Sequence, residues 1–132
     1  MRIVLDSSVL IAAHITRAGV CAELFEDVLM QHQLVTSGFI LNELARKLTV
    51  KFAFEQSVVR QIVRFVTKHA AVVEPSALPQ DIGRDPEDIP ILGTAVSGKA
   101  ALLITVDKDL LAVGEYGGIA VVRPGEFWRR VG

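Results

Sequence analysis

Short apolar runs alternate with amphipathic segments along this chain of 132 residues, and this alternation constrains the fold more than any other feature. Strands that alternate with helices form parallel sheets covered by helices on both faces. The pattern therefore predicts an α/β fold, a three-layer α/β/α sandwich around a mostly parallel sheet of about five strands. The runs with the length and valine, leucine and isoleucine content of buried strands are Arg2 to Leu5, Leu34 to Thr36, Ala71 to Val73, Leu102 to Thr105 and Ile119 to Val122.

Between these runs the apolar residues recur at helical spacing. One stripe lies on the segment from Cys21 to about Gln31, and two more lie between Ser37 and Ala70. We predict that the last two helices form a hairpin projecting from the sheet, with the break in the weakest helical stretch, Thr49 to Phe54. The stripes consist of Leu24, Phe25, Val28 and Leu29; of Ile40, Leu44 and Leu48; and of Val58, Val59, Ile62, Val63 and Val66.

A further helix is predicted by its end signals. Asp88 stands where an N-cap would, Pro90 falls in the first turn, and Gly98 lies just past the expected end. Before this helix, the prolines and glycine between residues 75 and 87 indicate an irregular loop.

Length and composition exclude several classes of protein. A chain of this size buries roughly two-thirds of its unfolded surface, so residues 1–132 are expected to form one domain without disulfides. An apolar content of 51% and a net charge of −1 exclude intrinsic disorder, and no apolar run approaches the length of a membrane span. Asp6 interrupts the apolar N-terminus where a signal peptide would continue, so we predict a cytoplasmic protein with no membrane association.

The side chains that carry chemistry are acids at the expected ends of strands. Ligands of open parallel sheets bind at the carboxyl ends of the strands. Asp6 and Asp107 follow two predicted strands, Glu43 lies one to two turns into the helix after a third, and Asp88 begins a helix that feeds a parallel strand. We therefore expect these four carboxylates to converge on one cleft.

Clustered carboxylates repel one another unless a cation lies among them, and oxygen ligands suit Mg²⁺ or Mn²⁺. Such ions support hydrolysis of phosphodiesters. Competing phosphate chemistries lack their residues, because the chain has no P-loop lysine motif and no G-x-G-x-x-G after a strand. A haloacid-dehalogenase type of phosphatase would need an acid at position 8, which is Ser8. Among these phosphate chemistries, the residues of the chain favour metal-dependent hydrolysis of phosphodiesters.

Four motifs in chain order carry a resemblance over nearly the whole chain. It resembles the PIN-domain nucleases, and among them the VapC-like toxins of toxin-antitoxin pairs. The segment 117–127 also fits the last strand and helix of that family. The motifs are Asp6-Ser7-Ser8-Val9-Leu10-Ile11, Asn42-Glu43-Leu44, Asp85-Pro86-Glu87-Asp88 before Ile91-Leu92-Gly93-Thr94-Ala95, and Leu103-Ile104-Thr105-Val106-Asp107-Lys108-Asp109-Leu110-Leu111.

The resemblance implies an α/β/α sandwich, Mg²⁺ or Mn²⁺ cofactors, cleavage of single-stranded RNA, and often a homodimer with a cognate antitoxin protein. It assigns metal binding and catalysis to the four acids named above, with Asp109 as a fifth ligand. Either Asp107 or Asp109 could be the metal ligand after the fourth strand, and Asp107 is preferred because it is nearer the strand end. Asp85 or Glu87 could share the role of Asp88. Relatives carry Thr-Asn where this chain has Ser7-Ser8, which leaves the role of position 8 open.

Basic residues near the acids are candidates for contacting phosphate. Arg84 and Lys108 are close to the acids in sequence, and the resemblance adds the hydroxyls of Ser7 and Thr105 as groups that support water or phosphate. A second set recurs at helical spacing, as a solvated face or an RNA track: Arg46, Lys47, Lys51, Arg60, Arg64 and Lys68.

Charge also bears on the choice of function. With four of the 15 acids assigned to a metal site, 11 acids remain against 14 basic residues, a balance that favours nucleic acid. Together with the resemblance, the acids predict a metal-dependent endoribonuclease, and the resemblance implies that it is the toxin of a type II toxin-antitoxin pair. The alternative is a catalytically inactive PIN-like module that binds RNA or protein.

Overall fold

The central sheet has six strands in the order β3-β2-β1-β4-β6-β5. The computed structural model describes residues 1–16, 19–79 and 85–131. All five predicted strands are present within one residue of their predicted bounds, and they are parallel to one another. They are β1 (Arg2–Leu5), β2 (Gln33–Thr36), β3 (Ala70–Val72), β4 (Leu102–Ile104) and β6 (Ile119–Val122).

The sixth strand, β5 (Glu115–Tyr116), was not predicted. It has only two residues and no apolar run, and it pairs antiparallel with β6 at the edge of the sheet. The connection is the pair Gly117 and Gly118, whose φ angles of 57° and 84° suit the tight turns that join two antiparallel strands. The hairpin depends on this glycine turn, so the periodicity of the strand could not reveal it.

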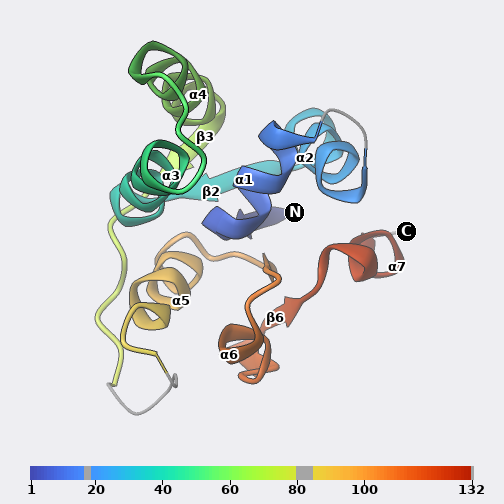
Figure 1. Ribbon diagram of the computed structural model, residues 1–132. Helices are drawn as coiled ribbons and strands as arrows, with labels where there is room; N and C mark the ends of the chain where they lie inside the picture. The colour runs from blue at the N-terminus through green and yellow to red at the C-terminus, as the bar shows by residue number, and fades with distance from the viewer. Residues whose placement is uncertain (17–18, 80–84, 132) are drawn as a thin grey trace.

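Helices cover both faces of the sheet, as predicted (Figure 1). One side carries α1 (Ser7–Ile15), α2 (Val20–Gln31), α3 (Gly38–Val50) and α4 (Gln56–His69), and the other side carries α5 (Asp88–Ser97). Two short helices, α6 (Lys108–Leu111) and α7 (Phe127–Val131), follow β4 and β6, the latter after a 3₁₀ turn at Pro124–Glu126. The strand order reverses between β1 and β4, and ligands of open α/β sheets bind at such a point.

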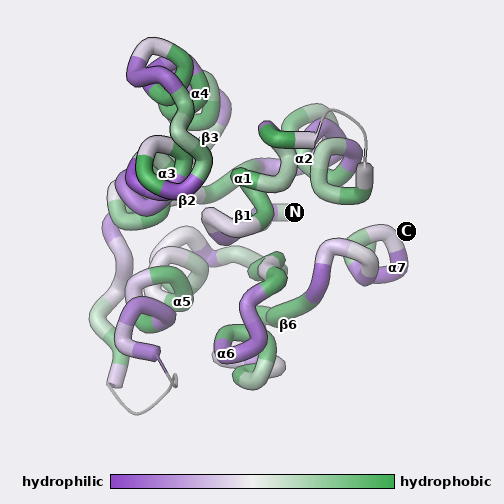
Figure 2. Tube along the Cα trace, in the orientation of Figure 1, coloured by the Kyte–Doolittle hydropathy of each residue, from purple (hydrophilic) through white to green (hydrophobic). Residues whose placement is uncertain are grey.

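The predicted hairpin of α3 and α4 is present, with its break at residues 51–55. In Figure 2, α4 carries hydrophobic and hydrophilic residues on different sides, whereas β6 is hydrophobic throughout. The buried residues of α4 are Val59 and Val66, and Arg60, Arg64 and Lys68 are exposed. No amphipathic period marks α1, because its apolar residues surround the helix and Val9, Leu10 and Ile11 are all buried.

The start of α5 differs from the prediction. Asp88 is the first residue of the helix, and Glu87 is its N-cap, with no hydrogen bond from the Glu87 side chain. The backbone amide of Asp88 already donates to the carbonyl of Asp85 at 2.9 Å, so Asp88 lies inside the turn. The helix ends as predicted, with Gly98 as its C-cap.

One hydrophobic cluster lies on both sides of the sheet. Its fully buried members include Leu5 from β1, Leu44 from α3, Leu103 from β4 and Phe127 from α7. Among the described residues, no helix alone has the length and hydropathy to cross a bilayer, and α1 with α2 would do so only as a pair bent by 108°.

Candidate functional site

The acids predicted from the sequence lie along the edge of the sheet where the parallel strands end. Asp6 follows β1, Asp107 lies three residues after β4, and Glu43 faces inward from the second turn of α3, which begins after β2. Asp88 enters from the other side at the start of α5. Three of these carboxylates are buried, namely Asp6, Glu43 and Asp88, while Asp107 is exposed.

Asp6 is the most firmly held of the four. Its side chain is 4% exposed and accepts three hydrogen bonds: from the Ser7 amide at 2.8 Å, from Ser8 Oγ at 2.9 Å, and from Thr105 Oγ1 at 2.8 Å. Burial raises the pKa of Asp6 and the nearby charge of Glu43 adds to the rise, whereas these hydrogen bonds lower it. The carboxylate is therefore oriented but costly to ionise.

Thr105 joins two neighbouring segments of this edge. Its hydroxyl is fully buried, donates to Asp6 and accepts from the backbone amide of Asp107 at 3.0 Å. Its own amide bonds to the carbonyl of Val122 at 3.0 Å, which extends the pairing of β4 and β6. The side chain that orients Asp6 thus also fixes the start of the loop carrying Asp107.

Glu43 is tied to the same centre through Ser7. Ser7 Oγ donates to Glu43 Oε1 at 2.5 Å, while the Ser7 amide bonds to Asp6. One turn further along α3, Lys47 Nζ lies 3.7 Å from Glu43 Oε1 and 3.5 Å from Ser7 Oγ. An ammonium group therefore partly balances this buried carboxylate, and both predicted hydroxyls, those of Ser7 and Thr105, are bonded to acids.

Asp88 carries an unsatisfied charge. It is 3% exposed, and its Oδ2 has no hydrogen-bond partner among the described residues. Burial, followed by the charges of Asp107, Asp85 and Asp109, raises the pKa of Asp88 to about 6. A buried carboxylate without a partner is destabilising unless a cation compensates it. Oxygen donors alone suit Mg²⁺ or Mn²⁺, so the residues present fit these ions.

The remaining predicted residues lie at the rim. Asp107 Oδ1 accepts from the Asp109 amide at 2.8 Å, which caps α6. Asp109 is half-buried, and Lys108 is exposed beside it on the first turn of α6. Arg84 lies outside the described residues.

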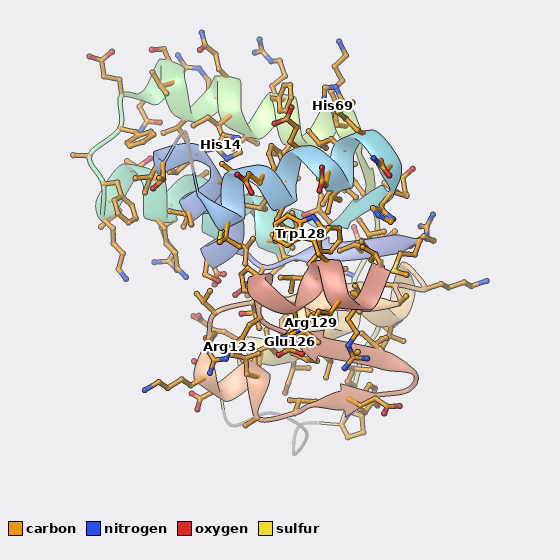
Figure 3. All side chains as sticks on the ribbon, turned by 90° about the vertical axis from the view of Figure 1, so that its right-hand side faces the viewer. His14, His69, Arg123, Glu126, Trp128 and Arg129 are labelled. Atoms are coloured by element: carbon orange, nitrogen blue, oxygen red, sulfur yellow. The ribbon has the colours of Figure 1, made fainter. Side chains whose placement is uncertain are left out.

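The carboxylates are arranged as two neighbouring groups, one of Asp6 with Glu43 and one of Asp88 with Asp107. Within residues 1–16, 19–79 and 85–131, no three Asp, Glu, His or Cys side chains are placed so that they could hold one ion together. The metal-binding role of these residues therefore stays a prediction. His14 and His69, which Figure 3 labels, each bond to a carbonyl of their own helix.

The sequence analysis left the role of Ser8 open, assigned Lys47 to a solvated face or an RNA track, and did not single out Arg123. Ser8 and Lys47 contact Asp6 and Glu43, and only the four-residue spacing of Glu43 and Lys47 on one helix signals such a contact. Arg123 directly follows β6, and the pairing of Ile104 with Val122 puts it beside Thr105. Figure 3 shows Arg123 at the same end of the sheet as α6.

Comparison with known proteins identifies the family. The sequence profile of the PIN domain matches residues 2–109. The chain belongs to the PIN-domain family. No curated protein sequence matches it significantly.

Solved structures show the same PIN-domain fold. The chain is similar to VapBC2 from Rickettsia felis, solved bound to a DNA fragment from their promoter, at 13% identity and a TM-score of 0.64, covering 93% of this chain and 98% of that one. It is similar to PAE2754 from Pyrobaculum aerophilum at 17% identity and a TM-score of 0.65, and the match covers 99% of this chain and 89% of that one. VapBC-1 from nontypeable Haemophilus influenzae gives 19% identity and a TM-score of 0.58, covering 86% and 92%.

Replacing the Thr105 hydroxyl tests the link between β1 and β4. Thr105→Val keeps the shape but removes one hydrogen bond from Asp6 and the bond of the Asp107 amide, so we expect a loss of about 1–3 kcal/mol in the free energy of unfolding. Thr36→Val is the matched control, because Thr36 Oγ1 is buried and has no partner among the described residues, so its removal should be neutral or stabilising. Urea unfolding measures both, and equal effects of the two substitutions would contradict the assigned role of Thr105.

Stability of the metal-free PIN domain should fall with rising pH. The folded pKa of Asp88, about 6, is above its ordinary value of 3.8, so the folded state binds more protons between these values. The free energy of unfolding is thus expected to decrease from about pH 4 to about pH 6, and Asp6, also with a raised pKa, adds to the fall.

Asp88→Asn should reduce this pH dependence. Its free energy of unfolding should match that of the parent protein near pH 4 and exceed it near pH 7. Urea unfolding in EDTA across this range provides the measurement. Glu87→Gln, a change at the exposed neighbouring residue, is expected to leave the slope unchanged. A slope in Asp88→Asn as steep as in the parent protein would show that Asp88 does not titrate as described.

Proposed function

We propose that this PIN domain is a metal-dependent endoribonuclease that hydrolyses phosphodiester bonds of single-stranded RNA. The observation that carries the proposal is the buried Oδ2 of Asp88, which has no hydrogen-bond partner in the part of the chain that the structure describes and shares the acid edge with the buried carboxylates of Asp6 and Glu43. Such an arrangement is stabilised by a divalent cation. Membership of the PIN-domain family supports the same activity.

Asp6, Glu43, Asp88 and Asp107 would hold Mg²⁺ or Mn²⁺, with Asp109 as a further ligand. When bound, such ions polarise a phosphodiester and make water a better nucleophile. Ser8 and Thr105 keep Asp6 in one orientation, and Ser7 does the same for Glu43. These hydroxyls preorganise the acids, which reduces the reorganisation that binding requires.

Substrate phosphate would be met by cations outside the acid groups. Lys108 is exposed on the first turn of α6, and Arg123 extends from the end of β6. Both lie at the edge that carries Asp107, so they are placed to neutralise the strand of an RNA bound there. Arg84, predicted for the same task, lies outside the described residues.

We also propose that the chain is the toxin of a type II pair, acting in the cytoplasm as a homodimer that a cognate antitoxin protein inhibits. Two of the similar structures are those of VapBC proteins, which supports this role. Apolar side chains left exposed on the helices, such as Met30 and Val50, are available for contacts with a second copy or an antitoxin.

One observation favours a second candidate function, a PIN-like module that binds RNA or protein without cleaving. Asp6 is fully engaged by three hydrogen bonds, and no three potential ligands in the described part of the chain lie within reach of one ion. A module of this kind has no reason to bind Mg²⁺ or Mn²⁺. Calorimetric titration with Mn²⁺ separates the candidates, because only the nuclease requires the ion.

RNA cleavage is the direct test of the nuclease. Incubated with a mixed pool of single-stranded RNAs and Mn²⁺, the protein should produce new 5′ and 3′ ends that sequencing detects. Asp6→Asn should reduce cleavage to the level of an EDTA control, because it removes one carboxylate charge at nearly constant shape. Glu26→Gln, at an exposed acid of α2, should cleave normally. Cleavage that survives both Asp6→Asn and EDTA would overturn the metal-dependent mechanism.

Growth measurements test the toxin role separately. Induced expression of the chain in bacteria should arrest growth, and expression of Asp6→Asn at the same level should not. Co-expression of a small protein encoded beside the chain's own gene should restore growth. Normal growth with an active, soluble nuclease would contradict the toxin role while leaving the nuclease intact.

A further inference from the structure

A small pocket lies next to the acid edge, between α1 and the end of α3. Its volume is about 190 Å³, and it is lined by Ser8, Ile11, Lys47, Lys51 and Phe52. We call it the α1–α3 pocket. In Figure 1, α1 and α3 lie side by side, and the two helices pack against each other.

Two residues that line the α1–α3 pocket contact acids of the candidate site. Ser8, which lines it, donates to Asp6 Oδ2 at 2.9 Å. Lys47, which also lines it, lies 3.7 Å from Glu43 Oε1. A strand whose phosphate meets Asp6 and Glu43 would therefore place its adjoining nucleotide at this pocket.

The lining joins positive charge to an exposed aromatic ring. Lys51 is exposed at the C-cap of α3, and Phe52 follows it with 43% of its surface exposed. Phe52 makes no aromatic contact among the described residues. Its face is thus available at the rim, beside two ammonium groups, those of Lys47 and Lys51.

This combination matches single-stranded nucleic acid better than an acidic peptide. Proteins that bind single strands combine cations along the backbone with aromatic side chains on which bases stack. The ammonium groups alone would attract either ligand, whereas the exposed ring adds affinity for the flat face of a base.

We propose that the α1–α3 pocket is a subsite for one nucleotide of the RNA strand next to the cleaved bond, a proposal that rests on the proposed nuclease function. Phe52 stacks on the base, and Lys51 pairs with the phosphate that flanks it. Lys47 remains with Glu43 and adds positive charge between the subsite and the acids. The subsite accepts any base, since every base presents an aromatic face.

Binding measurements with two substitutions test the subsite. The probes are a short fluorescein-labelled oligouridylate and an abasic oligomer of the same length, with Ca²⁺ in place of Mn²⁺ to limit cleavage. Phe52→Ala should weaken binding of the oligouridylate about fivefold or more and leave the abasic oligomer unaffected. Lys51→Gln should weaken both and reduce the slope of log affinity against log salt by about 0.7.

Matched controls come from residues outside the pocket. Phe65 of α4 is exposed to 44%, close to the value for Phe52, and Lys99, between α5 and β4, is exposed, so Phe65→Ala and Lys99→Gln should bind both probes like the parent protein. In cleavage assays, Phe52→Ala should raise KM and leave kcat nearly unchanged. Circular dichroism confirms that each variant is folded.

The outcomes separate the subsite from the nuclease. If the parent protein binds and cleaves RNA while Phe52→Ala and Lys51→Gln behave like the Phe65→Ala and Lys99→Gln controls, the subsite is wrong and the nuclease stands. If the parent protein neither binds nor cleaves, the nuclease fails and the subsite fails with it. Equal affinity for the two probes, together with tight binding of an oligoglutamate peptide, would assign the pocket to an acidic peptide and overturn the proposal.

Discussion

The buried carboxylate of Asp6 is the constraint on which the rest of this edge depends. A charge at the end of a central strand is costly unless donors surround it, and the chain provides them from two directions, Ser8 on α1 and Thr105 after β4. The strand pairing of β1 with β4 brings the Thr105 hydroxyl into reach of Asp6. Fold and site are thus built by the same contacts, because the sheet register that packs the core also orients the acid.

The two groups of acids differ in how their charge is handled. The carboxylates of Asp6 and Glu43 accept hydrogen bonds from hydroxyls, and Lys47 lies beside Glu43, so the charge of this group is partly compensated. Asp88 is buried with one oxygen that has no partner among the described residues, and Asp107, Asp85 and Asp109 are nearby. Electrostatic strain is therefore concentrated at the start of α5. Sites that bind cations often retain such strain, since a fully satisfied carboxylate gains less from an ion.

Hydrophobic patterning was sufficient for most of the fold. The five long strands and the α3–α4 hairpin follow from apolar runs and helical stripes, whereas β5 depends on a glycine turn and α1 has no polar face to reveal it. The positions of Asp6 and Glu43 followed from the rule that strand ends meet at one edge. Their partners did not, because the contact of Thr105 with Asp6 depends on side-chain rotamers and on a register between residues distant in sequence.

The separation of Asp6 and Thr105 in the sequence affects the order of events during synthesis and folding. Asp6 and Thr105 are 99 positions apart, so the hydroxyl that orients the first acid is synthesised long after the acid itself. Contacts between such remote residues form only once the entropy of closing the intervening loop is overcome, and they form late in folding. In a nascent chain whose β4 segment has not yet left the ribosome, Asp6 lacks the hydrogen bond from Thr105. Assembly of the acid edge is thus delayed until synthesis has passed Thr105.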